Sequence, residues 1–229
     1  GIKTCKTMYV RKIESVFQAW MDTPSHKPIV VKGVRQCGKT SSVVDFANKH
    51  FRHIVYLDFR EHPDYKMFFT PNLNVDDIIM RITAAMPDVE IEAGNTCFIF
   101  DEIQDCPRAR GSLKYFFLDG RFEVMCTGSL LGVNGYKSRE EQAEEADASI
   151  PVGFEDIVNM YPMDFEEWLW ANGIKPMHID YLRQCLDNEA PVDASIHARF
   201  RELFHQYVIV GGMPEAVTAF LNTRQIGKV

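Results

Sequence analysis

The stretch that decides the fold is GVRQCGKT, residues Gly33 to Thr40. It matches the pattern G-x-x-x-x-G-K-[ST] at every fixed position, and it follows the apolar run PIVV at 28–31. Glycines permit a tight loop whose backbone N–H groups face phosphate oxygens, and the start of the next helix adds a positive dipole end. We therefore expect a nucleotide phosphate chain to be cradled by Gly33, Val34, Arg35, Gln36, Cys37, Gly38, Lys39, Thr40 and Ser41.

Side chains of this loop are also expected to contact the phosphates and the metal ion. Lys39 is expected to reach the β and γ phosphates as a point charge, and the Thr40 hydroxyl is expected to bind Mg²⁺. Arg35 is either a phosphate contact or a solvated side chain. Cys37 is expected to be partly exposed, so that bound nucleotide would protect it from alkylation.

A second motif, CFIFDEIQ at 97–104, ends an apolar run in two adjacent carboxylates. After such a loop, the first acid, Asp101, is expected to orient Mg²⁺, and the second, Glu102, to polarise the attacking water. The next apolar run ends in CTGS, so Ser129 or Thr127 is expected to point toward the γ-phosphate. Three arginines could reach the nucleotide of a neighbouring copy if the chain assembles, and otherwise are solvated surface residues: Arg108, Arg110 and Arg139.

Short apolar runs alternate with helical patterns over residues 1–161. Helices are expected at 39–49, 75–86 and about 110–118, and the apolar runs lie at 28–33, 53–59, 96–102, 122–129 and 155–161. Nearly continuous apolar character is typical of strands buried on both faces of a parallel sheet. The alternation predicts right-handed crossovers and a doubly wound α/β sheet over a core at 1–161.

From Pro162 the pattern is helical, which predicts a second unit at 162–229. Asp164 is the expected N-cap of the first helix, with Glu167 in the capping-box position and Gly173 just past its end. Further helices are expected at about 177–186, at 194–209 and from Pro214 onward. Between the two units, the polar and acidic stretch 131–152 is expected to be a mobile loop.

Composition narrows the classes of function. The chain has 229 residues, of which 46% are hydrophobic and 25% charged, so it is long enough to bury a core. No stretch approaches the ~18 apolar residues of a membrane helix, and the first residues lack the apolar core of a secretory signal. The six cysteines lack C-x-x-C or zinc-like spacing, which predicts a reducing, cytoplasmic compartment.

Charge is spread unevenly around the net value of −7. Residues 1–40 hold eight Lys and Arg against two acids, whereas ten Asp and Glu fall between Glu140 and Glu167. The acidic stretch is either a solvated face or a surface that pairs with something basic. The isoelectric point of about 5.5 disfavours a uniformly basic nucleic-acid clamp, while local basic patches stay open.

Five segments occur in a distinctive order: GVRQCGKT, FIFDEIQ, TGSLLG, SIPVGFEDIVNMYPMDFEEWL and VIVGGMPEAV. Together they resemble a prokaryotic group of AAA-type P-loop ATPases, whose core precedes a C-terminal domain of unknown function. The resemblance implies an additional-strand (ASCE) sheet in the order 5-1-4-3-2, with the Walker B strand beside the P-loop strand, and then a winged-helix-like segment. It also implies Walker A roles for Lys39 and Thr40, Walker B roles for Asp101 and Glu102, and the sensor position for Ser129 or Thr127.

Two features depart from that group. Phe154 stands where a basic residue usually follows PVG, and the sequence ends at Val229, whereas chains of the group continue well past GGMPEA. We therefore expect this sequence to be a fragment of a longer chain.

These patterns favour a Mg²⁺-dependent ATPase that hydrolyses ATP as a conformational switch, with Lys39, Glu102 and Ser129 as catalytic residues and Thr40 and Asp101 at the metal. Two alternatives stay open: a nucleotide-gated scaffold with negligible turnover, and a P-loop kinase for a small molecule. The acid pair and the lack of an Arg-rich lid at 131–152 disfavour the kinase. A DNA or protein partner for the C-terminal part and a homo-oligomer also stay open, and no membrane partner is expected.

Overall fold

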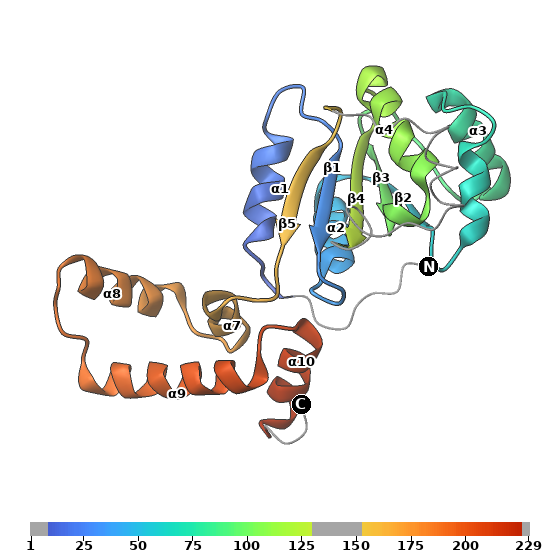
Figure 1. Ribbon diagram of the computed structural model, residues 1–229. Helices are drawn as coiled ribbons and strands as arrows, with labels where there is room; N and C mark the ends of the chain where they lie inside the picture. The colour runs from blue at the N-terminus through green and yellow to red at the C-terminus, as the bar shows by residue number, and fades with distance from the viewer. Residues whose placement is uncertain (1–8, 130–152, 226–229) are drawn as a thin grey trace.

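A computed structural model describes residues 9–129 and 153–225 (Figure 1). Five strands form one parallel sheet in the order β2-β3-β4-β1-β5. The strands are β1 (Ile29–Gly33), β2 (His53–Asp58), β3 (Thr96–Asp101), β4 (Glu123–Ser129) and β5 (Asp156–Met160). Each predicted strand is confirmed to within one residue at either end, and the predicted order is confirmed when it is counted from the β5 edge.

One expectation about the sheet is wrong: β3, which ends in Asp101, does not lie beside β1. β4 separates them, with Val31 of β1 opposite Thr127 and Phe100 of β3 opposite Cys126. After β1 the chain crosses over the sheet to β2, which leaves the position beside β1 for a later strand. β4 occupies this position, where a strand is buried on both faces, and its residues are mostly buried. As a result, the end of β4 lies between the phosphate-binding loop and Asp101.

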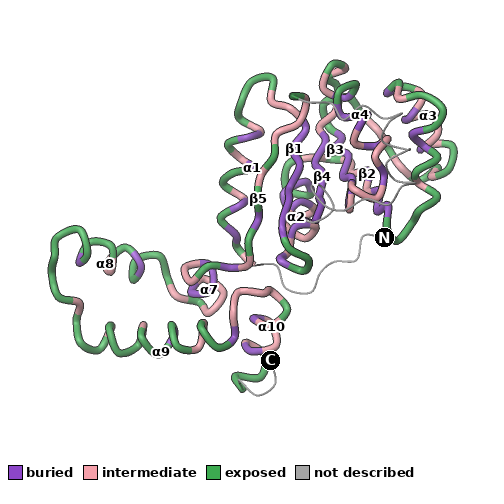
Figure 2. The backbone as a smooth tube through the Cα atoms, viewed as in Figure 1, coloured by how far each residue is buried: buried purple, intermediate pink, exposed green. Residues whose placement is uncertain are grey.

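Helices cover both faces of the sheet; β1, β3 and β4 are buried between them, whereas β5 at the edge is partly exposed (Figure 2). One face packs against α1 (Ile13–Met21) and α2 (Lys39–His50). The other packs against α3 (Val75–Ala85), α4 (Pro107–Asp119) and the 3₁₀ helix η1 (Pro63–Phe69), while the short 3₁₀ helix η2 (Ile103–Asp105) follows β3. This confirms the doubly wound arrangement that the continuous apolar runs predict.

Three of these elements, α1, η1 and η2, are not among the predicted ones. In α1, Ile13, Phe17 and Trp20 recur at helical spacing and are all buried against the sheet. α1 stabilises the fold through this face, and it brings the residues that precede it close to the phosphate-binding loop.

Four helices follow β5: α7 (Phe165–Ala171), α8 (Pro176–Asp187), α9 (Ala194–Val210) and α10 (Pro214–Thr223). The predicted capping box of α7 is confirmed, because Asp164 accepts from the Glu167 amide at 2.9 Å while Glu167 accepts from the Asp164 amide at 3.2 Å. Gly173 follows α7 with φ +79°. No strand is found among the described residues after Met160.

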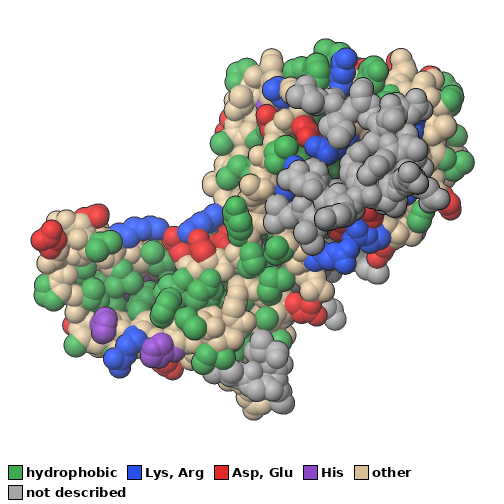
Figure 3. All heavy atoms as spheres, viewed as in Figure 1, with side chains coloured by type: hydrophobic (Ala, Val, Ile, Leu, Met, Phe, Trp, Pro, Cys, Tyr) green, Lys and Arg blue, Asp and Glu red, His purple; other side chains and the backbone are tan. Residues whose placement is uncertain are grey.

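The four helices share a core of their own around Trp168, Leu203 and Val217. α8 and α9 extend away from the sheet as a helical hairpin (Figure 1). Hydrophobic side chains gather over this hairpin (Figure 3), and its exposed large apolar residues are Met177, Leu186, Phe204, Val208 and Ile209. Among the described residues, no helix combines the length and apolar character needed to cross a bilayer.

Part of the uneven charge of the sequence is paired within the described residues. Lys12 Nζ lies 2.6 Å from Asp164 and 2.8 Å from Glu166, and Arg11 Nε lies 3.1 Å from Glu167. The basic N-terminal region therefore meets the end of the acidic stretch at α7. The segment 131–152, expected to be a mobile loop, lies outside the described residues.

Candidate functional site

The phosphate-binding loop joins β1 to α2. Each of its two motif glycines is required for a different geometric reason. Gly38 has φ +98° at the N-cap of α2, a left-handed conformation that glycine adopts without a steric penalty. Gly33 ends β1, where an added Cβ would lie 2.3 Å from the carbonyl oxygen of Met160 in β5. Gly38 therefore turns the loop, and Gly33 allows β1 to pack closely against β5.

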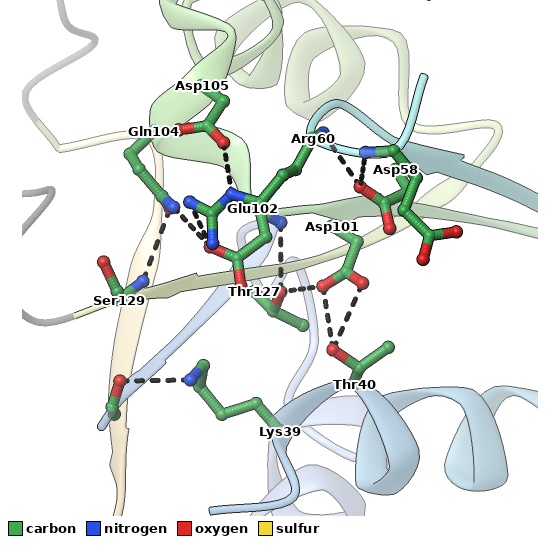
Figure 4. Close-up of polar contacts among 12 residues, drawn as sticks. Lys39, Thr40, Asp58, Arg60, Asp101, Glu102, Gln104, Asp105, Thr127 and Ser129 are labelled. Carbon is green, nitrogen blue, oxygen red and sulfur yellow. Dashed lines mark hydrogen bonds and ion pairs between the residues drawn. The ribbon is translucent and has the colours of Figure 1, made fainter. Parts of the chain in front are cut away.

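Lys39 opens α2 and folds back over the loop (Figure 4). Its Nζ donates to the carbonyl oxygens of Gly33 at 3.1 Å and Val34 at 2.8 Å, and the side chain is buried. The ammonium group thus lies inside the curve of the loop that carries the backbone amides.

Asp101 is the centre of a first polar cluster (Figure 4). Thr40 donates to Asp101 Oδ1 at 2.9 Å, Thr127 donates to the same oxygen, and Tyr56 donates to Oδ2 at 2.5 Å. Burial and the contact with Asp101 raise the pKa of Tyr56 above its ordinary value, so its hydroxyl remains a donor. Hydroxyl groups from α2, β2 and β4 therefore fix the orientation of this buried carboxylate.

Glu102 is the centre of a second cluster (Figure 4). Its backbone has φ +54°, an uncommon value for a residue with a side chain, and its amide donates to Thr127 at 3.2 Å. Arg60 Nη2 lies 3.1 Å from Glu102 Oε2, and Gln104 donates to the same oxygen. Gln104 also accepts from the Ser129 amide at 3.4 Å, so it joins Glu102 to the end of β4.

The expectation that Cys37 is partly exposed is wrong. The residue is completely buried, and its Sγ donates to the Met160 carbonyl at 3.7 Å. The loop turns this side chain inward, into the core formed with β1 and β5, which removes the thiol from solvent. Cys37 therefore contributes its backbone to the loop surface, and its side chain packs in the core.

The candidate arginines occupy different places. Arg35 is exposed on the loop. Arg108 donates to the carbonyls of Phe69 and Pro71, both at 2.8 Å, and Arg110 donates to Glu155 at 3.0 Å in a buried ion pair. Arg108 and Arg110 thus make contacts within the chain, and Arg139 lies outside the described residues.

A cavity of about 640 Å³ opens beside the loop. It is lined by the start of α2, by Glu102, by Tyr9 and Arg11 before α1, and by Pro214 and Thr218 of α10. This volume is in the range of pockets that hold small ligands such as nucleotides. The cavity brings the predicted loop and Glu102 together with two segments that the sequence analysis did not connect to it.

Tyr56, Arg60 and Arg11 are site residues that the sequence analysis missed. Strands of a parallel sheet end at the same edge, so the polar residues around the end of the predicted strand at 53–59 were a usable signal for the first two. Asp58 lies directly opposite Asp101 in the register of β2 and β3. Arg11 belongs to no motif, and nothing in the sequence placed it near the loop.

This fold and this arrangement of loop, lysine and paired acids define a P-loop nucleotide-binding protein. The family model described as an AAA domain matches residues 25–169, which is well over half of the sequence. The chain belongs to the AAA domain family. No curated protein matches the sequence.

Three solved structures resemble the chain at low sequence identity. The Walker-type ATPase of Pyrococcus abyssi has a TM-score of 0.54 at 14% identity over 96% of this chain and 70% of its own. AMPPCP-bound DnaA from Aquifex aeolicus has a TM-score of 0.48 at 11% identity, over 97% of this chain and 64% of its own. PCH-2 of C. elegans has a TM-score of 0.46 at 13% identity, over 94% of this chain and 63% of its own. The first likeness supports the ATPase fold, and the chain spans less than two thirds of the other two.

Proposed function

We propose that the chain binds ATP with Mg²⁺, hydrolyses it to ADP and phosphate, and changes the position of its C-terminal helices with the state of the nucleotide. The observation that carries the proposal is the meeting of Lys39, the Thr40–Asp101 pair and Glu102 beside one cavity. We place the ATPase core at 1–161 and the responding helical unit at 162–229.

The donor atoms at Thr40 and Asp101 fit Mg²⁺. A hydroxyl and a carboxylate are the hard oxygen ligands that this ion prefers, and it needs few of them because it keeps several waters. Thr40 and Asp101 would hold the ion, which would supply positive charge to neutralise the phosphates. The chain already holds the two oxygens 2.9 Å apart, and Tyr56 and Thr127 keep the carboxylate turned toward Thr40.

Lys39 and the loop amides supply positive charge to the phosphates. The Lys39 ammonium group would exchange its two carbonyl partners for phosphate oxygens, which are stronger acceptors because they are anionic. We propose that Ser129, at the end of β4, acts with Lys39 on the charge that develops during phosphate transfer. The amides of Gly33 to Ser41 would cradle the remaining phosphate oxygens.

Glu102 is the group proposed to orient water and accept its proton on a carboxylate oxygen. It lines the cavity next to the loop, while Arg60 and Gln104 hold its Oε2. Because Gln104 also contacts the Ser129 amide, the position of the base is tied to the end of β4.

The helices α8 and α9 give no electrostatic support to DNA, one of the two kinds of partner left open for the C-terminal part. They hold three arginines and three acids, and Arg183 and Arg199 are paired with Glu166 and Glu202. Nucleic-acid binding depends on an excess of basic side chains that neutralise phosphates. We therefore propose the nucleotide switch without a nucleic-acid partner, and the client stays open.

The proposal is tested by ATP affinity and by phosphate release without any acceptor. Lys39→Ala should weaken ATP binding by more than about 10-fold, and Glu102→Gln should retain affinity and lower turnover by about 100-fold or more. Lys114→Ala on α4 and Glu202→Gln on α9 are matched surface controls. Equal turnover in all variants would refute hydrolysis at this site, and tight ATP binding without turnover in the wild type would favour the nucleotide-gated scaffold.

A further inference from the structure

We infer that Arg11 is a positioning residue that orients one amide of the phosphate-binding loop and joins the loop to the first turn of α7. The inference rests on the proposed ATP binding, and it adds a route from the phosphates to the helical unit. Nothing in the motifs of the sequence assigns a role to this residue.

Arg11 joins two regions that are far apart in the chain, the phosphate-binding loop and residues 161–167. Its Nη1 donates to the Cys37 carbonyl at 2.8 Å, its Nη2 donates to the Tyr161 carbonyl at 2.7 Å, and its Nε lies 3.1 Å from Glu167 Oε1. The residue is 8% exposed. A guanidinium group suits this place because its planar fork of donors can serve separate acceptors at the same time.

The peptide bond between Cys37 and Gly38 links this contact to the phosphate site. In a trans peptide, the carbonyl and the following N–H point in opposite directions, and this bond is not among the cis peptides of the described residues. Because Arg11 holds the Cys37 carbonyl, the Gly38 N–H points away from the guanidinium. Gly38 lines the cavity, so this amide is one of those available to a phosphate oxygen.

Arg11 and a bound phosphate would therefore act on the same peptide group from opposite ends. A donor on the carbonyl and an acceptor on the N–H polarise the group together, so each hydrogen bond strengthens the other. It follows that Arg11 increases the affinity for phosphate and that phosphate tightens the contact of Arg11 with Cys37, since such a coupling is reciprocal.

The other end of Arg11 is adjustable. Glu167 already accepts from the Lys12 amide at 2.7 Å and from the Asp164 amide in the capping box. The Arg11 Nε lies close enough for an ion pair but makes no hydrogen bond to any residue that the structure describes. Because the two atoms are already 3.1 Å apart, a small change in the orientation of α7 relative to Arg11 would align this bond.

A shift of α7 would be passed on to the wall of the cavity. The Met163 amide, just before α7, donates to the Gly212 carbonyl at 2.7 Å, just before α10. Pro214, the first residue of α10, lies close to Gly38 on the same side as Arg11: its Cγ is 3.5 Å, and the Arg11 Nη1 3.3 Å, from the position of an added Cβ. The loop, α7 and α10 thus form one closed set of contacts around Arg11.

The experiment compares Arg11→Gln, Arg11→Lys and the neutral pair Arg11→Gln with Glu167→Gln. Lys12→Gln is the matched control, because Lys12 is the next residue and its side chain pairs with Asp164 and Glu166 at the surface of α7. ATP affinity, the unfolding midpoint, and hydrogen exchange of α7 with and without a non-hydrolysable ATP analogue are measured.

We expect each Arg11 variant to lose about 10-fold in ATP affinity and to lose the nucleotide-dependent protection of α7, whereas Lys12→Gln retains both. The neutral pair leaves no buried charge unpaired, so it separates binding from loss of the fold. Wild-type affinity and protection in a folded Arg11→Lys or neutral-pair variant would overturn the inference. Failure of the wild type to bind ATP would instead refute the proposed function.

Discussion

Replacing Gly212 with alanine tests how closely the start of α10 is held against the segment before α7. A Cβ at Gly212 would lie 2.0 Å from the Met163 carbonyl oxygen and 2.9 Å from the Met163 nitrogen. Both are backbone atoms, so neither can turn away as a side chain would. The two segments would have to separate by about 1.4 Å to bring the 2.0 Å contact to the 3.4 Å of an ordinary one, because the packed interior has no room to absorb the methyl group.

The cost follows from two contributions. Separation would lengthen or break the 2.7 Å hydrogen bond from the Met163 amide to the Gly212 carbonyl, which is worth about 1 kcal/mol. Forcing an extra methyl group into a packed contact costs a further ~1–3 kcal/mol. We therefore expect Gly212→Ala to lower the free energy of unfolding by about 3 kcal/mol. ATP affinity should fall as well, because Pro214 and Thr218 of α10 line the cavity.

Urea unfolding and ATP titration measure both effects. Gly173→Ala is the control, because Gly173 has φ +79° but nothing within 4 Å of an added Cβ. It should cost only the ~1–2 kcal/mol of a left-handed residue with a side chain and should leave ATP affinity unchanged. If Gly212→Ala costs no more than Gly173→Ala, the close backbone contact is refuted.

Three other features give predictions. Partial burial alone would raise the pKa of Asp164, but hydrogen bonds from the Glu167 amide and Lys12 outweigh it and hold the pKa below its usual range. The stability from this lowered pKa is present above the ordinary pKa of an aspartate and is lost as the pH falls through the lowered pKa. The difference in urea midpoint between wild type and Asp164→Asn should therefore shrink on acidification; an equal difference at neutral and at strongly acidic pH would contradict this. Arg110→Met should cost about 3 kcal/mol because Glu155 stays buried without its partner, and adding Glu155→Gln should recover most of the loss in the same assay; equal losses would rule out the buried pair. Cys37 should resist maleimide with or without ATP and react only after unfolding, as followed by mass spectrometry; rapid labelling of the native chain would contradict its burial.

The strands of the sheet could be predicted because each one is marked by its own short run of residues. Runs such as CFIF and EVMC are apolar at almost every position, which marks strands covered on both faces, and polar or glycine residues mark their ends. α1 was also within reach of the sequence, since Ile13, Phe17 and Trp20 fall on one helical face. The same local logic identified Lys39, Thr40 and the two acids.

The remaining site residues depend on tertiary contacts that no local pattern contains. Tyr56 contacts Asp101 only because β2 pairs with β3 in one particular register. Cys37 is buried because the loop turns that side chain toward Met160, a residue 123 positions away in the chain. Arg11 meets Glu167 only after the helical unit has packed against the sheet. Motifs therefore located the chemistry, and the packing of distant segments determines how it is held.

The hydrogen bond between Met163 and Gly212 closes a ring in the chain, from which α8 and the far end of α9 project as a side branch. Residues on that branch can be added, removed or replaced without changing the distance that α10 must span to reach the cavity. Changes in the length of the projecting hairpin would therefore leave α7 and α10 in place, with α10 at the wall of the cavity. The part of the helical unit that is free to vary in length is thus distinct from the part that lines the cavity.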